Sequence, residues 1–208
     1  MLDLRMNFHD VLPAFGDLLN TRLGKSVFTT EDSVRYTLFA AILERTSLRP
    51  EEIVLEQPHP SIQRAQIDTW ILPTASRRGI AIEFKYDREI PSSQNTPRTQ
   101  KAGKVFHDLY RLGLAPANLS RIFVYLSGSE MSSYFLNQSN GLAGFFSLPA
   151  SQSLKIDATF LHGRSNTFTQ ACSQVPDVAV KLIYSRSLPR QHELRVFEVT
   201  NIELPTEV

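Results

Sequence analysis

The stretch IDTWILPTASRRGIAIEFKYD, residues 67–87, contains two apolar runs on either side of a polar turn. Successive side chains of a β-strand point to opposite faces, and both runs alternate in this way. The stretch therefore predicts a β-hairpin. Each run also carries charged residues among its apolar ones: Asp68 in the first, and Glu83 and Lys85 in the second.

A turn centred on Ala75–Ser76 places Asp68 directly opposite Glu83, with their β-carbons roughly 5 Å apart. Two carboxylates in that position repel each other, and a shared proton or a neighbouring cation removes the repulsion. Lys85, two residues along the strand, cannot bridge both acids well, whereas a divalent metal ion can. We therefore expect a metal site at Asp68 and Glu83, with Mg²⁺ or Mn²⁺ as the cofactor and Lys85 beside a metal-bound water. The alternative is an amphipathic hairpin whose solvated face carries these charges, because an E-x-K triplet alone is a common pattern.

The rest of the chain predicts a single α/β (α+β) domain over residues 1–208, in which helices flank a central mixed β-sheet. A helix is expected from an N-cap at Asp10 to a stop at Gly24, and a second helix from Thr29–Thr30. Further strands are expected in residues 51–58, 119–128, 178–186 and 192–202, and further helices in residues 100–114 and 130–138.

Residues 139–176 are rich in Ser, Asn, Gln and Gly and show weak periodicity. They predict irregular structure or loosely packed short elements. We accordingly divide the chain into a core of about residues 25–138 and a β-rich C-terminal extension of about residues 139–208. That extension is expected to bind nucleic acid or to form a dimer interface.

Composition excludes several classes of protein. No run of about 18 apolar residues occurs, so no membrane span is expected. The first ten residues, MLDLRMNFHD, have no signal-peptide core, which favours a cytoplasmic protein. The single cysteine, Cys172, excludes an intramolecular disulfide and a cysteine-based zinc cluster.

The charge of the chain is unevenly distributed. Its formal net charge is only +1, but residues 77–121 hold nine basic residues against four acidic ones. Such a basic segment can contact phosphate groups of a nucleic acid. A solvated surface of mixed charge explains the same numbers equally well.

Asp68, fourteen intervening residues and then Glu83-Phe84-Lys85 form a pattern that resembles the PD-(D/E)xK nuclease superfamily, which includes many restriction endonucleases and junction resolvases. The resemblance spans about residues 29–128. It implies a restriction-endonuclease-like core, in which a helix bearing an acid precedes three antiparallel strands, a helix and a further strand. Ile67 stands where the motif name has proline, which many members of the superfamily lack.

The resemblance also assigns roles to residues. It implies that Asp68 and Glu83 bind the metal, with the backbone carbonyl of Phe84 as a further ligand. Lys85 would position or deprotonate the attacking water, or stabilise charge on the phosphate. Glu31 matches the helix acid that reaches the metal, often through water. The plain alternative for Glu31 is an acid in a first helical turn that complements the helix dipole.

The helix after the motif begins with Gln100, Lys101 and Lys104, at a position from which family members contact phosphate. An exposed helix face is the alternative for the two lysines. The RecB-like branch has Q-x-x-x-Y here, whereas this chain has Lys104 four residues after Gln100.

Together these features predict a Mg²⁺-dependent nuclease that hydrolyses phosphodiester bonds, with DNA as the partner and a defence or repair role. A homodimer is compatible with this prediction, since such nucleases often cut two strands as dimers. The alternative is a catalytically inactive nuclease fold that binds nucleic acid or another protein.

Overall fold

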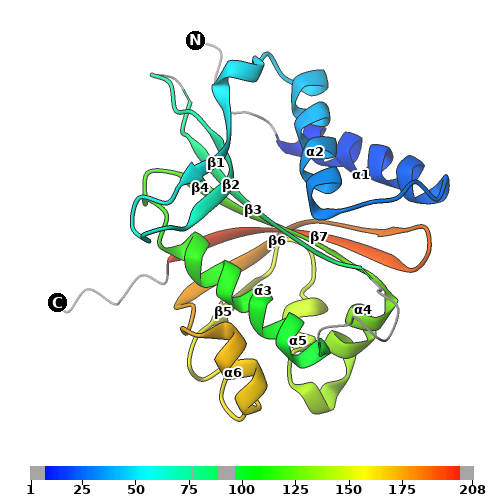
Figure 1. The fold of residues 1–208 in the computed structure, drawn as a ribbon, viewed down its shortest axis with the longest axis vertical. Coiled ribbons are helices and arrows are strands. Elements are labelled where there is room, and N and C mark those ends of the chain that lie inside the picture. The colour runs from blue at the N-terminus through cyan, green and yellow to red at the C-terminus, as the bar shows by residue number, and fades with distance from the viewer. Residues whose placement is uncertain (1–7, 76, 89–96, 202–208) are drawn as a thin grey trace.

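A seven-stranded mixed β-sheet forms the centre of the protein, and helices cover both of its faces (Figure 1). The computed structural model describes residues 8–75, 77–88 and 97–201. The strand order is β1-β2-β3-β4-β7-β6-β5, in which only the β3–β4 pair is parallel. The strands are β1 (Ile53–Pro58), β2 (Gln66–Ile71), β3 (Ile80–Asp87), β4 (Ser120–Ser127), β5 (Ser153–Ile156), β6 (Val178–Leu188) and β7 (His192–Asn201).

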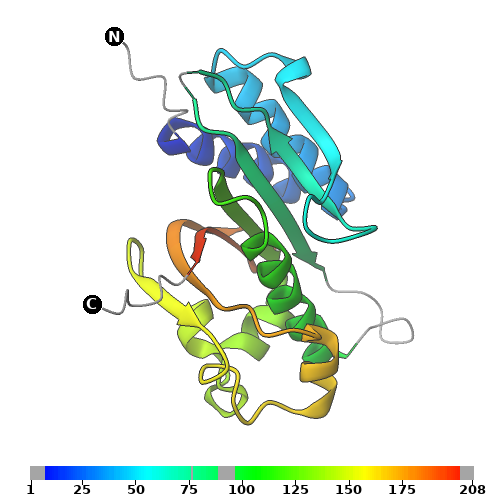
Figure 2. The same ribbon diagram turned by 90° about the vertical axis from the view of Figure 1, so that its left-hand side faces the viewer.

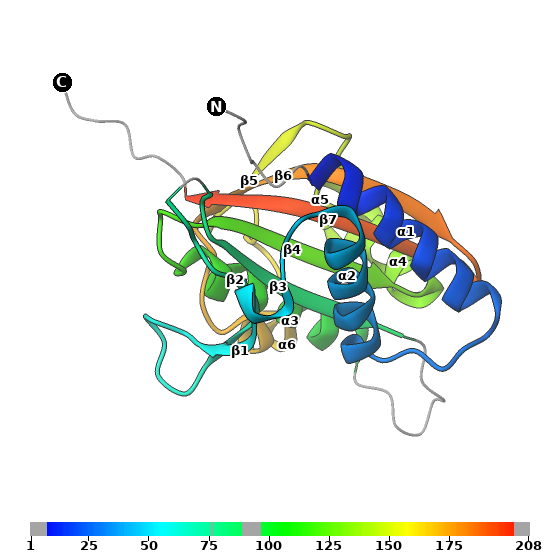
Figure 3. The same ribbon diagram turned by 90° about the horizontal axis from the view of Figure 1, so that it is seen from above.

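Two long N-terminal helices cover one face of the sheet (Figure 3), and the other helices cover the opposite face (Figure 2). The α-helices are α1 (Phe8–Gly24), α2 (Glu31–Arg45), α3 (Arg98–Gly113), α4 (Ser129–Leu136), α5 (Ala143–Phe146) and α6 (Asn166–Cys172), with short 3₁₀ turns at Pro50–Glu52 and Gln138–Asn140. Each face has its own apolar core, because the strands between the two layers of helices carry apolar side chains on both sides.

The predicted hairpin is confirmed, including its register. Trp70 pairs with Ala81, as a turn centred on residues 75 and 76 requires. The chain then crosses over through α3 to β4, which lies parallel to β3, and this places α3 against the face of the sheet that bears Glu83 and Lys85.

The helix starts show one confirmation and one correction. Thr30 caps α2, because its hydroxyl accepts a hydrogen bond from the backbone N–H of Ser33 and the Ser33 hydroxyl accepts one from Thr30 N–H. Asp10 does not cap α1. This helix already includes Phe8, and Asp10 lies in its first turn.

The two strands expected in the C-terminal part of the chain are present, and they complete the central sheet. β7 pairs with β4, and β6 and β5 follow outward from β7. The prediction of loosely packed structure in residues 139–176 is wrong. Phe145, Phe146 and Phe168 are fully or almost fully buried and belong to the core beneath α3.

Helix α6 lies unusually close to α3. A β-carbon added at Gly103 would lie only 2.5 Å from the backbone carbonyl oxygen of Phe168 and 2.7 Å from Ala171 Cβ. A glycine is therefore required at this crossing. None of the helices in the described ranges is long and apolar enough to span a membrane.

Candidate active site

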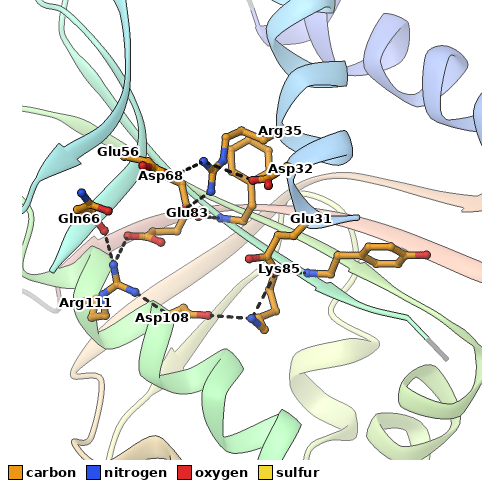
Figure 4. A network of polar contacts seen from close by, with 12 residues as sticks. Glu31, Asp32, Arg35, Glu56, Gln66, Asp68, Glu83, Lys85, Asp108 and Arg111 are labelled. Atoms are coloured by element: carbon orange, nitrogen blue, oxygen red, sulfur yellow. Dashed lines mark hydrogen bonds and ion pairs between the residues drawn. The ribbon is translucent and has the colours of Figure 1, made fainter. Parts of the chain in front are cut away.

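The candidate site lies along the edge of β3, beyond the point where β2 stops pairing with it (Figure 4). The ladder with β2 ends at Ile82, whereas the ladder with β4 continues to Asp87. Backbone N–H groups on this edge need other acceptors, and carboxylates supply them. The N–H of Phe84 donates to Asp68 Oδ2 over 2.8 Å. Asp68 thus lies one residue past the ladder, in the gap between the two strands.

Glu31 performs the same function further along the edge. It is the first residue of α2, and its Oε2 accepts a 2.8 Å hydrogen bond from the backbone N–H of Tyr86. The same oxygen lies 3.3 Å from Lys85 Nζ, and Asp108 of α3 lies 4.0 Å from that nitrogen. The predicted approach of Glu31 to the motif is therefore present in the structure.

The surroundings of Lys85 favour its charged form. Burial lowers the pKa of Lys85, but the negative charges of Glu31, Asp108 and Asp87 outweigh it and raise the pKa above the ordinary value. Lys85 is therefore an ammonium ion throughout the neutral range.

Glu83 is almost completely buried, with 2% of its surface exposed. Arg111 of α3 donates to Glu83 Oε1 over 3.2 Å and also to the backbone carbonyl of Gln66. Burial raises the pKa of Glu83 well above its usual value, and the charge of Asp68 raises it further, while Arg111 lowers it. The effect of Asp68 on this pKa means that the two carboxylates interact, as the hairpin register predicts.

A second arginine, Arg35 of α2, holds Asp68 from the other face of the sheet. Its Nη2 lies 3.0 Å from Asp68 Oδ1, and its Nη1 lies 3.4 Å from Glu56 and 3.6 Å from Asp32. Glu56 stands opposite Asp68 on β1 and has a left-handed φ of 55°, so β1 is distorted there. Strands β1, β2 and β3 and the helices α2 and α3 thus contribute residues to one charged cluster.

We call this set the charged cluster: the carboxylates Glu31, Asp32, Glu56, Asp68, Glu83 and Asp108 with the cations Arg35, Lys85 and Arg111 (Figure 4). The acids outnumber the cations, and the burial of two of them makes the excess charge unfavourable. Burial raises the pKa of Asp108 to about 7, against the lowering effect of Lys85 and Arg111. A bound cation would relieve the excess.

The donors of the cluster fit Mg²⁺ in kind. Asp68 and Glu83 supply two interacting carboxylates, the usual number for this ion. In a strand, the N–H and C=O groups of one residue point toward the same side. The N–H of Phe84 donates to Asp68, so the carbonyl of Phe84 also faces Asp68. The arginines occupy these oxygens in the structure. In residues 8–75, 77–88 and 97–201, no group of three or more His, Cys, Asp or Glu side chains is arranged to hold a metal ion.

The residues predicted to contact phosphate lie at the start of α3 but in different environments. Lys104 is exposed and Gln100 is half-buried. Lys101 is buried, and its Nζ lies 3.5 Å from the backbone carbonyl of Arg88. An exposed helix face therefore describes Lys104, whereas it is wrong for Lys101.

Sequence reasoning did not identify Arg35, Asp108 or Arg111 as members of the site. A signal for them was present. Arg35 interrupts the apolar stripe of α2 between Val34 and Leu38, and Asp108 and Arg111 are spaced three residues apart on one side of α3. Charged residues at those positions must find partners on the neighbouring strands.

No family model matches this sequence, and neither a curated protein nor a solved structure was found to match it. The relation to the PD-(D/E)xK superfamily stays a prediction from the motif and its surroundings.

Proposed function

We propose that this protein is a metal-dependent nuclease that hydrolyses phosphodiester bonds in DNA. The observation that carries the proposal is the convergence of Asp68, Glu83 and Lys85 at the point where β2 and β3 separate, with Glu31 beside Lys85. The alternative of a solvated hairpin face is not favoured, since Glu83 is buried and its carboxyl group interacts with that of Asp68.

The order of elements supports the same proposal. An acid-bearing helix, α2, precedes the antiparallel strands β1, β2 and β3, and α3 and β4 follow. This is the order expected of a restriction-endonuclease-like core. Fold alone does not fix function, and the side chains at the site are what distinguish a nuclease from other proteins with this order of elements.

In the proposed mechanism Asp68, Glu83 and the carbonyl of Phe84 would hold Mg²⁺ or Mn²⁺, and Glu31 would reach the ion directly or through water. When bound, the ion supplies a Lewis acid and a water of lowered pKa. Arg111 contacts Oε1 of Glu83, so the ion and the guanidinium group would share this carboxylate.

Lys85 acts as a positive charge in this mechanism. The negative charges of Glu31, Asp108 and Asp87 raise its pKa, which favours the ammonium form. Glu31 and Asp108 hold the ammonium group in place, where it can stabilise negative charge that develops on the phosphate.

The test is cleavage of supercoiled plasmid and circular single-stranded DNA with Mg²⁺ or Mn²⁺. Wild type is compared with Lys85→Ala and Asp68→Asn. The matched control is Lys181→Ala, which removes an exposed lysine from β6, three strands away from β3. Wild type and control are expected to cleave and to leave 5′-phosphate ends. Each site variant is expected to lose about 10²–10³-fold in rate, as when one charge-stabilising group is removed.

The proposal is contradicted if wild type does not cleave either DNA, or if the two site variants cleave as fast as the Lys181→Ala control. In the second case the activity belongs to another site or to a contaminant.

A second candidate function is a nuclease-like fold that only binds nucleic acid. The pairing of Asp68 with Arg35 and of Glu83 with Arg111 favours it, since both proposed ligands already have cationic partners. Titration calorimetry with Mn²⁺ separates the two: the nuclease binds the ion and Asp68→Asn weakens that binding, whereas the binding module shows no heat of binding in either protein.

A further inference from the structure

A pocket of about 460 Å³ adjoins the charged cluster on the side of α3. One wall is the loop between β1 and β2, which contributes Arg64, and the other is α3, which contributes His107, Tyr110 and Arg111. Asp68 lies at the boundary between the pocket and the cluster. The volume is in the range of pockets that bind small organic groups.

The charged residues that line the pocket are Arg64, Arg111 and Asp68. Arg35 holds Asp68 at 3.0 Å. Arg111 contacts Glu83 at 3.2 Å and Asp108 at 3.5 Å, so the positive charge that a ligand meets in the pocket is carried mainly by Arg64. Arg64 is exposed, so its guanidinium group is accessible to a ligand. Arginine presents several N–H donors in one plane, which suits the oxygens of a phosphate group.

The α3 wall also carries two neighbouring aromatic rings. The ring centroids of His107 and Tyr110 are 6.4 Å apart, and the ring planes are inclined at 32°. His107 Nδ1 lies 3.1 Å from the backbone carbonyl of Cys172 and 2.9 Å from the Ser173 hydroxyl, so the orientation of its ring is fixed by the end of α6. Half-buried rings of this kind can stack against a nucleobase.

We infer that this pocket binds an unpaired nucleotide next to the bond to be cleaved, with its base against Tyr110 and its phosphate on Arg64 and Arg111. The substrate is therefore single-stranded or locally unpaired DNA. A base inside a duplex is covered by its neighbours on both faces and cannot enter a pocket without leaving the stack. The inference rests on the proposed nuclease function for the position of the cleaved bond.

The test measures binding without cleavage, by fluorescence anisotropy in EDTA. The probes are a short fluorescein-labelled oligothymidylate and a labelled duplex of the same length. Tyr110→Ala is expected to weaken binding of the oligothymidylate about 5-fold to about 100-fold and to leave duplex binding unchanged. Tyr110→Phe keeps the ring and is expected to bind like wild type. Arg64→Ala is expected to weaken binding and to reduce its dependence on salt.

Thermal unfolding by circular dichroism checks that each variant is folded, and Arg64→Ala changes an exposed side chain that does not support the core. The inference is overturned if Tyr110→Ala binds the oligothymidylate as tightly as wild type. It is also overturned if Tyr110→Phe loses as much affinity as Tyr110→Ala, or if wild type prefers the duplex.

The two proposals fail in different ways. Binding in EDTA does not require catalysis, so Lys181→Ala, which changes an exposed lysine three strands away from β3, is expected to bind the oligothymidylate like wild type. Wild type that binds through Tyr110 but cleaves no DNA contradicts the nuclease and supports the nucleotide site. Cleavage of single-stranded DNA at equal rates by wild type and Tyr110→Ala contradicts the nucleotide site and supports the nuclease.

Discussion

On one side of α3, the ring of Phe106 packs against the rings of Phe145 and Phe168, at centroid distances of 5.2 and 5.5 Å. On the other side, Asp108 and Arg111 face the charged cluster. The aromatic side needs only close packing, and its burial stabilises the fold. The charged side contains acids whose pKa values are raised by burial, so their ionised forms oppose folding.

One side of α3 therefore stabilises the fold, whereas the other side lowers its stability. A side that lowers stability at neutral pH is expected where charge is used for binding or catalysis, since function and stability often conflict at such sites. Four substitutions test the comparison, two on each side of the helix.

The largest expected effect is at the centre of the aromatic side. Phe106→Ala removes a fully buried ring that contacts other aromatic rings, so it should lower the free energy of unfolding by about 3–5 kcal/mol. Urea denaturation measures the change. Phe106→Leu, which leaves a smaller cavity, should lose less. An equal effect of both substitutions would mean that the space around residue 106 collapses after either change.

On the charged side, the pH dependence of stability should reveal Asp108. Its folded-state pKa of about 7 exceeds the ordinary value of 3.8, so the unfolded chain releases this proton first as the pH rises. Stability that is present below about pH 4 is therefore lost progressively up to about pH 7, by at most about 4 kcal/mol. Asp108→Asn does not titrate and should lack this loss.

Urea denaturation of wild type and Asp108→Asn in EDTA at several pH values measures the difference in slope. If the free energy of unfolding depends on pH in the same way in both proteins, Asp108 titrates at an ordinary pKa. Asp108 would then not make the charged side of α3 less stabilising than the aromatic side.

A substitution at Gly103 tests how closely α6 packs against the aromatic side of α3. Gly103→Ala places a methyl group 2.5 Å from the carbonyl of Phe168, so α6 must move away from α3. We expect a loss of about 1–3 kcal/mol in the free energy of unfolding, measured by urea denaturation. Gly144→Ala is the control, because its nearest neighbour, a ring atom of Phe160, would lie at an ordinary contact distance of 3.9 Å. Similar losses for both would exclude close helix packing as the reason.

Local rules predicted the parts of the fold that depend on neighbours along the chain. The hairpin register follows from its turn and its alternation, and the start of α2 follows from the cap at Thr30. The packing of Phe145 and Phe168 could not be predicted in this way. Phe168 stands alone among polar residues, and Phe145 lies in a short apolar stretch with weak periodicity. Their contacts with Phe106 of α3 bring the two rings into one core.

The same limit applies to the candidate site. The closeness of Asp68 and Glu83 follows from one hairpin, because the register that pairs Thr69 with Ile82 brings the next residue of each strand together just beyond the ladder. The contact of Arg111 with Glu83 depends instead on how the crossover helix lies on the sheet, and the contact of Arg35 with Asp68 depends on the opposite layer. Periodicity marks a charged residue on a helix face, but it does not identify the strand residue that the charge meets.

The smallest expected change in stability has the opposite sign and separates function from architecture. Glu83→Gln replaces a buried acid whose ionised form is disfavoured, even with Arg111 beside it, by a neutral group of the same shape. In EDTA at pH 8 this variant should be about 1 kcal/mol more stable than wild type in urea denaturation. The same variant should lose metal-dependent cleavage, because it removes one of the two carboxylates proposed to hold the ion. Gain of stability together with loss of cleavage identifies Glu83 as a residue retained for chemistry. A loss of several kcal/mol would instead make the pair with Arg111 a structural support, and the charged cluster would then stabilise the fold as the aromatic side does.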